Sequence, residues 1–222
     1  MPIETIHPLA TKKSKLPWIT LIILCTIATA AVLRRTFVLL SPPATSRTPD
    51  LDSMDAVFAA HRTMTLLHIL PALCLVLLLP FWFSSSIRQH HTTAHRRITQ
   101  ILFALGAITA ITAMVMNTHP IGGAIEVVAI LIFDTLFILS LARSYIFWLR
   151  GNIPQHRAWM TRAFAVLLGI ATTRPVMGIF FATSRLTHLQ PRQFFGIAFW
   201  IGFTLTWIAG EIYLRTRPAS TL

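Results

Sequence analysis

The chain of 222 residues is 55% hydrophobic and only 12% charged, and its mean hydropathy is +0.67. This composition is typical of a protein that crosses the membrane several times, and it excludes an ordinary soluble domain. The net charge of +12 comes mainly from sixteen arginines at the ends of apolar runs, an arrangement that excludes nucleic acid as a partner and favours lipid phosphate or another acidic group.

Six apolar runs are long enough to cross a bilayer, which takes about 20 mostly apolar residues. They cover residues 16–40, 63–83, 98–116, 121–148, 159–182 and 194–213. We therefore predict an all-α fold, a polytopic bundle of six transmembrane helices that forms one domain over residues 1–222. The first run follows three lysines and contains Ala-Thr-Ala at 28–30, as a secretory signal would, and we expect it to be retained as a span.

The longest connection between the runs, "SPPATSRTPDLDSMDA", contains three prolines and three aspartates. Both residue types are typical of turns and loops. We therefore expect residues 41–58 to form an extended loop outside the membrane. The two cysteines, Cys25 and Cys74, lie inside apolar runs, where a thiol behaves as a small hydrophobic group, so we infer neither a disulfide nor a cysteine-ligated metal.

The dipeptide His-Arg stands at the start of three apolar runs, with its histidine at His61, His95 and His156. Cations are mildly disfavoured at a helix N-terminus because the helix dipole is positive there. Another interaction must therefore favour these arginines. Lipid phosphate would explain arginines at the membrane surface, but it leaves the histidines unexplained.

Ionisable side chains inside membrane spans are unfavourable, so they are candidates for function. His68 follows His61 by two helical turns on the same face, about 10 Å deeper. Asp134 lies near the middle of the fourth run, whereas Glu126 lies at a depth similar to that of Arg174 in the fifth run, which predicts an ion pair between these two. The alternative interpretation is that such a pair has only a structural role and fixes the packing of the two helices.

The same reasoning about depth predicts a polar cluster near each membrane face. The outer cluster contains His61, His68, His119, Glu126 and Arg174. The inner cluster contains His90, His91, His95, Arg96, Arg97, Arg143, His156, Arg157, Arg162 and Glu211.

Arginine and lysine also predict orientation, because they are enriched in short cytoplasmic loops. With the N-terminus inside, ten of them fall on the inner side and six on the outer side. We therefore predict a multi-pass protein of the inner (plasma) membrane with both termini in the cytoplasm.

Paired histidines suggest haem b, because imidazole is the usual axial ligand of electron-transfer haem and facing helices of a bundle supply one each. Arginine binds carboxylates such as the haem propionates in bidentate fashion. The predicted metal ligands are His68, His95 and His156. The predicted cofactor-binding set adds His61, Arg96, Arg157 and Arg174, and the remaining polar core is Glu126, Asp134, Arg143, Arg162 and Glu211.

These stratified histidines resemble the two-haem transmembrane cytochromes b that reduce ferric iron or recycle ascorbate. Proteins of that kind take a ligand pair at each side of the membrane from four consecutive helices. Here His95 and His156 fit the inner pair, whereas the outer pair has only His68 on a span, with His119 in a turn as its stand-in. The pattern therefore accommodates one haem more readily than two.

A closer similarity covers the chain from the second run onward. Its most specific part is the string HRxWMxRxxA, formed by His156, Arg157, Trp159, Met160, Arg162 and Ala165, and "HRR", "TTRP" and "WIAGEIYLR" accompany it. These motifs resemble the bacterial membrane proteins of domain-of-unknown-function family 2306, although Gln100 replaces an arginine of that family's third-helix motif. The resemblance implies no reaction, but it implies a helical membrane protein with a shared polar core at His68, His95, His156, Arg157, Arg174 and Glu211.

Three functions remain open at this point. A haem-b protein would carry electrons between a quinol-like donor and an acceptor, through a quinone or a redox partner protein. A transporter of a small solute, ion or proton would use Asp134 and His68 as titrating groups, with helices broken at Pro71 and Pro175. A non-catalytic subunit would bind membrane lipid or a partner protein through its arginines. The sequence contains no Ser-His-Asp set, P-loop or glycine-rich nucleotide loop, and it leaves open whether the protein is an enzyme.

Overall fold

The computed structural model of the protein describes residues 15–41 and 49–216. Within these ranges every regular element is an α-helix, which confirms the predicted all-α fold. The helices are α1 (Leu16–Leu40), α2 (Pro49–Ala60), α3 (Arg62–Phe83), α4 (Ser85–His90), α5 (Thr92–Met116), α6 (Gly123–Leu149), α7 (Ile153–Leu167), α8 (Gly169–Thr187) and α9 (Pro191–Arg215).

Six stretches of the described chain are long and apolar enough to cross a membrane, as predicted. Five of them are the single helices α1, α3, α5, α6 and α9, and the sixth is Ile153–Ser184, which α7 and α8 form together. Large apolar side chains such as Ile23, Leu77 and Ile111 are at least half exposed on the outside of the bundle. An apolar exterior of this kind suits contact with lipid tails.

The connection between the first two spans differs from the prediction, because residues 49–60 form the helix α2 and not an extended loop. Pro49 occupies the first position of this helix, where its fixed φ favours helix and its missing N–H is of no consequence. Met54, Val57 and Phe58 follow at helical spacing, and all three pack into an apolar cluster with residues of α6, α8 and α9. The expectation of an extended loop at 41–58 is therefore wrong from residue 49 onward.

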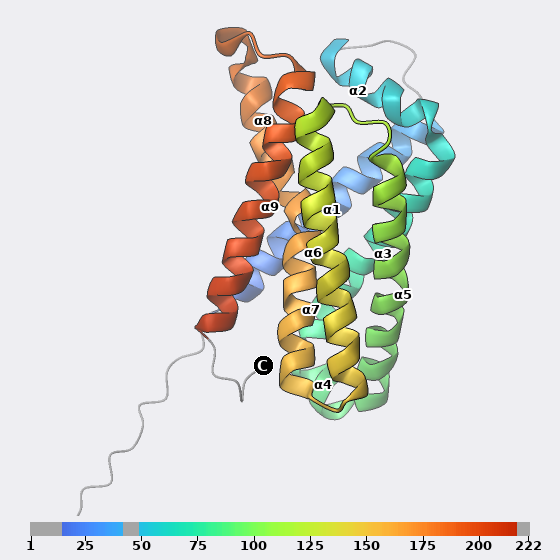
Figure 1. Ribbon diagram of the computed structural model, residues 1–222, viewed down its shortest axis with the longest axis vertical. Coiled ribbons are helices and arrows are strands. Elements are labelled where there is room, and N and C mark those ends of the chain that lie inside the picture. The colour runs from blue at the N-terminus through green and yellow to red at the C-terminus, as the bar shows by residue number, and fades with distance from the viewer. Residues whose placement is uncertain (1–14, 42–48, 217–222) are drawn as a thin grey trace, which may run out of the picture.

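The helices form a bundle with two distinct ends (Figure 1). The α2 end holds α2 together with the turns that join α5 to α6 and α8 to α9, and the α4 end holds α4 and the turn that joins α6 to α7. Helix α6 packs against α7 and α9, α8 against α9, and α3 against α5, whereas α1 crosses obliquely behind them (Figure 1).

Two glycines allow α8 and α9 to approach closely. A Cβ atom on Gly169 would lie 2.3 Å from Cδ1 of Phe203, and one on Gly202 would lie 2.8 Å from the backbone nitrogen of Thr173. Any larger residue would push the two helices apart. This contact fixes the part of α8 that contains Thr173 and the residue after it, Arg174.

The half of the bundle toward the α4 end is close-packed. Leu79, Leu102 and Met160 are completely buried there, and Trp82 and Phe164 are almost so. The indole N–H of Trp82 donates a hydrogen bond to Oγ1 of Thr99 across 3.2 Å, so the polar atom of this large side chain is satisfied. The half toward the α2 end is different, because it contains a cavity.

Candidate functional site

A cavity of about 420 Å³ lies between the helices in the α2 half of the bundle. Its volume falls in the range of sites that hold small molecules. Its walls are mostly apolar, and they include Ile130, Phe133, Phe137, Phe199 and Phe203. A few polar side chains converge on this apolar space, namely Arg35, His61, Thr65, His68, Thr109, His119, Glu126, Asp134 and Arg174.

Arg174 of α8 has no carboxylate partner among the residues that the structure describes. Its guanidinium makes no ion pair and no hydrogen bond within residues 15–41 and 49–216, and its Nε atom is buried. Two like-charged side chains of α1, Arg34 and Arg35, act on it electrostatically. Because a guanidinium keeps its charge in proteins, a partly buried one without an ion pair favours an anion from elsewhere.

Glu126 does not pair with Arg174, so that expectation from the sequence is wrong. The carboxylate lies at the first turn of α6, where Oε2 accepts a hydrogen bond of 2.6 Å from the backbone N–H of Gly122. A carboxylate is stabilised at this position by the helix dipole and by the free N–H groups of the first turn. Glu126 therefore already has partners in its own helix and leaves Arg174 unneutralised.

Asp134 is the second unsatisfied group of the cavity. Its side chain is 8% exposed, and Oδ2 is buried without a hydrogen-bond partner in the described part of the chain. A buried carboxyl oxygen without a partner is unfavourable in a membrane span. The cavity thus presents both an unpaired donor, at Arg174, and an unpaired acceptor, at Asp134.

His68 of α3 contributes a ring with one nitrogen engaged and one available. Nδ1 lies 3.2 Å from the carbonyl oxygen of Thr109 and 3.0 Å from Oγ1 of Thr112. A carbonyl oxygen only accepts hydrogen bonds, so Nδ1 carries the proton in this arrangement. Nε2 makes no hydrogen bond with the described residues, and the ring lines the cavity.

His61 and His119 meet at the α2 end of the cavity. Their ring centroids are 3.9 Å apart, and Nδ1 of His119 lies 2.8 Å from Oγ1 of Thr118. The turn residue His119 therefore reaches the same cavity as His68, although it lies outside the helices.

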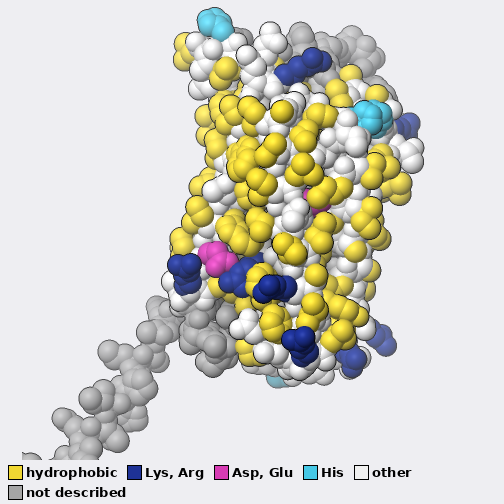
Figure 2. All heavy atoms as spheres, in the orientation of Figure 1, with side chains coloured by type: hydrophobic (Ala, Val, Ile, Leu, Met, Phe, Trp, Pro, Cys, Tyr) yellow, Lys and Arg dark blue, Asp and Glu magenta, His cyan; other side chains and the backbone are white. Residues whose placement is uncertain are grey.

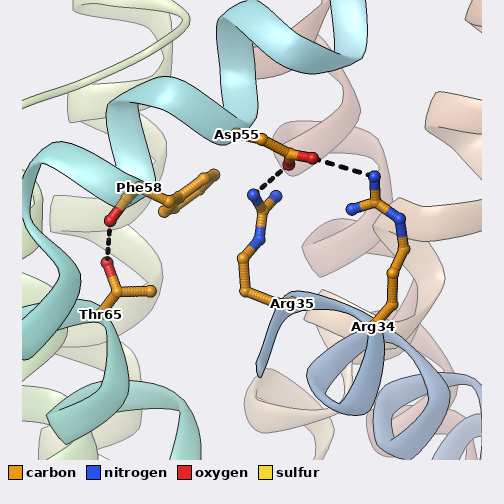
Figure 3. Close-up of polar contacts among 5 residues, drawn as sticks. All are labelled: Arg34, Arg35, Asp55, Phe58 and Thr65. Atoms are coloured by element: carbon orange, nitrogen blue, oxygen red, sulfur yellow. Dashed lines mark hydrogen bonds and ion pairs between the residues drawn. The ribbon is translucent and has the colours of Figure 1, made fainter. Parts of the chain in front are cut away.

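Helix α2 closes the α2 end through one aspartate that binds two arginines of α1 (Figure 3). Asp55 Oδ2 lies 3.1 Å from Nη2 of Arg34, and Asp55 Oδ1 pairs with Nη1 of Arg35. The guanidinium of Arg35 also lies 4.0 Å from the ring centroid of Phe58. Thr65 Oγ1 donates to the Phe58 carbonyl oxygen across 3.1 Å and so ties α2 to α3.

Sequence reasoning missed this contact between α1 and α2. The sequence pattern that indicates this contact is the helical spacing of Asp55 and Phe58, which lie three residues apart on one face. The nearby prolines and aspartates, which are typical of loops, obscured this pattern.

Two histidines of the α4 end, His95 and His156, are engaged with neighbouring protein groups. Nε2 of His95 lies 3.2 Å from the carbonyl oxygen of Trp82, and Nδ1 of His156 lies 3.1 Å from the carbonyl oxygen of Ser144. The Trp82 ring packs against both imidazoles, at centroid distances of 5.9 Å and 6.3 Å. Axial ligation of a haem through Nε2 of His95 would replace its bond to Trp82, and haem binding here stays a prediction.

Three or more histidine, cysteine, aspartate or glutamate side chains do not gather into a metal site anywhere in residues 15–41 and 49–216. The three predicted metal ligands are divided between the two halves, with His68 at the cavity and His95 and His156 beside Trp82.

The arginines of the α4 end interact with aromatic rings and with one acid. Nε of Arg162 lies 2.6 Å from Oε1 of Glu211 and Nη2 lies 3.2 Å from Oε2, the geometry of a bidentate pair. Arg96 lies over the ring of Trp148 at 5.8 Å. The predicted cofactor-binding arginines are thus separated, because Arg174 lies at the cavity, whereas Arg96 and Arg157 lie with the histidines of the α4 end.

The family described as predicted membrane protein (DUF2306) matches the chain over residues 65–214. The chain belongs to this family. The match includes His68, Asp134 and Arg174 of the cavity and the interacting groups of the α4 end, while α1 and α2 precede it. Searches of the curated proteins and of the solved structures gave no match, so the resemblance to two-haem cytochromes stays a prediction.

Proposed function

We propose that this DUF2306 protein binds an amphiphilic ligand with an acidic head group in the cavity of its α2 half. The observation that carries the proposal is the guanidinium of Arg174, which lines a mostly apolar cavity without a carboxylate partner in the described chain. A carboxylate or phosphate would supply the missing negative charge and accept two parallel hydrogen bonds. The aromatic and aliphatic walls would hold an apolar tail.

Two further groups give the cavity a means of orienting such a ligand. Asp134 offers Oδ2, and His68 lines the cavity with Nε2 unengaged by the described residues. A polar substituent on the tail would bond to one of these groups. Because the rest of the wall is mostly apolar, a polar substituent placed against its apolar side chains would lose its hydrogen bonds to water without replacement, which makes the site selective.

The experiment measures binding of dodecanoate, dodecyl phosphate and methyl dodecanoate to the full chain in detergent by isothermal titration calorimetry. We expect both acids to bind and the neutral ester to bind at least about tenfold more weakly, because it cannot form a charge-assisted bond. Comparison of the two acids distinguishes a carboxylate head from a phosphate head.

Variants locate the binding. Arg174→Gln should reduce the affinity for the preferred acid at least about tenfold, whereas Arg192→Gln, which removes an exposed arginine at the start of α9, should leave it unchanged. Equal binding of the acids and the ester, or unchanged binding by Arg174→Gln, would refute the proposal.

A haem-b electron carrier between a quinol-like donor and an acceptor is the second candidate function. The observation that favours it is the unengaged Nε2 of His68, with His61 and His119 lining the same cavity. The chemistry that haem would supply is one-electron transfer. Protein purified from haem-supplied cells should then show a Soret band in a reduced-minus-oxidised spectrum that His68→Ala removes. A spectrum without this band would refute the candidate.

We further propose that the protein lies in the inner membrane with its α4 end and both termini at the cytoplasmic side. The excess of arginine and lysine over residues 12–15, 88–97, 150–157 and 215–217 supports this orientation. A phosphatase that is active only outside the cytoplasm, fused to the C-terminus, should be inactive, and an active fusion would reverse the assignment.

A further inference from the structure

Arg143 occupies an unusual place on the outer surface of α6. It is exposed, and it lies four residues after Leu139 and three before Ile146, which share its helix face and are 52% and 44% exposed. Lipid tails contact a face of this kind in a membrane protein. A cation within such a face is unfavourable unless an anion accompanies it.

The position of Arg143 along α6 allows it to reach the membrane surface. The helix ends at Leu149, six residues later, which corresponds to about 9 Å along the helix axis. An arginine side chain spans much of this distance when it extends toward the surface with its methylenes against apolar neighbours. The guanidinium can therefore meet a lipid head group while its Cα atom stays at the level of the tails.

A tryptophan and a second arginine adjoin it. The guanidinium carbon of Arg143 lies 5.0 Å from the ring centroid of Trp159, and that of Arg162 lies 4.6 Å from the same ring. Glu211 already neutralises Arg162 through its bidentate pair. Arg143 makes no ion pair or hydrogen bond with the described residues, so the group of four side chains carries one uncompensated positive charge.

This group lies at the surface of the bundle. Figure 2 shows basic side chains beside acidic atoms in the lower part of the visible face, where α7 and α9 approach the α4 end, with hydrophobic side chains around them.

We propose that Arg143, Trp159 and Arg162 form a binding site for the phosphate of an anionic phospholipid. A phosphodiester carries one negative charge, which matches the single uncompensated charge of the group. The N–H groups of a guanidinium can donate parallel hydrogen bonds to its two non-bridging oxygens. Tryptophan is favoured at the level of the head groups, because its ring is apolar and its N–H is polar. Leu139 and Ile146 offer an apolar surface to the acyl chains.

The surface favours a lipid over a protein as the occupant. Exposed large apolar side chains occur on every predicted span, for example Phe37, Leu67, Ile111, Leu139, Ile179 and Leu205, so no single helix face is set apart for a partner subunit. The feature that distinguishes the face of Arg143 is its charge. An anion carried by the surrounding membrane satisfies that charge without a protein partner.

The test is native mass spectrometry of the full chain, released from detergent with equal amounts of phosphatidylglycerol and phosphatidylcholine. We expect phosphatidylglycerol to be retained in preference, with one tightly held molecule per chain. Arg143→Gln should reduce this preference about tenfold, because it removes the charge-assisted bonds. Arg143→Lys should keep part of it, since a lysine retains the charge but not the planar stacking on Trp159.

Arg192→Gln is the matched control, because it removes an exposed arginine from the start of α9, at the opposite end of that helix from Glu211. It should leave the preference unchanged. Trp159→Leu provides a second variant that lowers the preference while all arginines remain. Equal retention of the two lipids, an unchanged preference in Arg143→Gln, or a dimer that depends on Arg143 would each overturn the proposal. Binding of dodecanoate reports on the cavity and is expected to be the same in all these variants.

Discussion

The two halves of the bundle contain similar residue types but use them differently. In the α4 half three polar side chains predicted for the inner cluster have protein partners: Arg162 pairs with Glu211, and His95 and His156 bond to backbone carbonyl groups around a packed core. In the α2 half Arg174 and Asp134 lack partners in the described chain, and a cavity lies beside the apolar cluster. Histidine and arginine content alone therefore does not distinguish the two halves, whereas unsatisfied polar atoms beside a cavity do.

The largest expected effect lies in the packed half. Trp82→Ala would remove a side chain that is 1% exposed and contacts His95, His156 and Phe164. We expect the free energy of unfolding to fall by about 3–5 kcal/mol, as for other large buried aromatics. Thermal unfolding in detergent measures this effect. A loss below about 1 kcal/mol would mean that the α4 half is not the rigid part of the molecule.

The next effect comes from breaking the ion pair of the α4 end. Arg162→Leu would leave the Glu211 carboxylate, which is 23% exposed, without its partner. We expect a loss of about 2 kcal/mol, between the values for exposed and for fully buried pairs. The double variant Arg162→Leu with Glu211→Leu should recover most of this stability in the same measurement, and failure to recover it would show that the pair does not act as a unit.

Arg174→Leu sharpens the comparison of the two halves, because its effect on stability should be opposite in sign to that of Arg162→Leu. It removes a partly buried charge that has no carboxylate partner among the described residues. We therefore expect the ligand-free protein to gain about 1–2 kcal/mol in stability while it loses binding of the acidic ligand. A loss of stability comparable to that of Arg162→Leu would erase the distinction between the two halves.

The smallest expected effect concerns the attachment of α2. Asp55→Asn would weaken the contacts to Arg34 and Arg35, of which Arg34 is half exposed. We expect a change in global stability below about 1 kcal/mol, because partly exposed pairs contribute little. Hydrogen exchange should nevertheless become faster over residues 54–60 and stay the same in α6. Unchanged exchange in α2 would show that its apolar contacts alone hold it.

The sequence predicted the fold well because the bilayer imposes simple requirements on length and hydropathy. Six apolar runs became six spans with ends shifted by a few residues, and the largest shifts are at the third and fifth spans, which both begin six residues earlier than predicted. The segment 49–60 escaped prediction because its helix is short and depends on tertiary contacts of Met54 and Phe58 for its stability. Such contacts cannot be counted before the neighbouring spans are placed.

The site was predicted in part, and the reason is geometric. Position along a span gives depth, and Arg174, His68 and Asp134, which the sequence places at depth, line one cavity. Depth does not give the direction in which a side chain points around the helix axis. The expected pair of Glu126 and Arg174 failed for this reason, since the carboxylate turns to the backbone of Gly122. Arg35 was missed because its partner Asp55 lies on α2.

Two prolines follow the cavity residues closely, Pro71 three positions after His68 in α3 and Pro175 directly after Arg174 in α8. Each lacks the N–H that would bond to the carbonyl group four residues earlier. Both helices can consequently bend at these prolines, beside the cavity, without breaking a backbone hydrogen bond there. The cavity therefore has two walls that can yield to tails of different thickness.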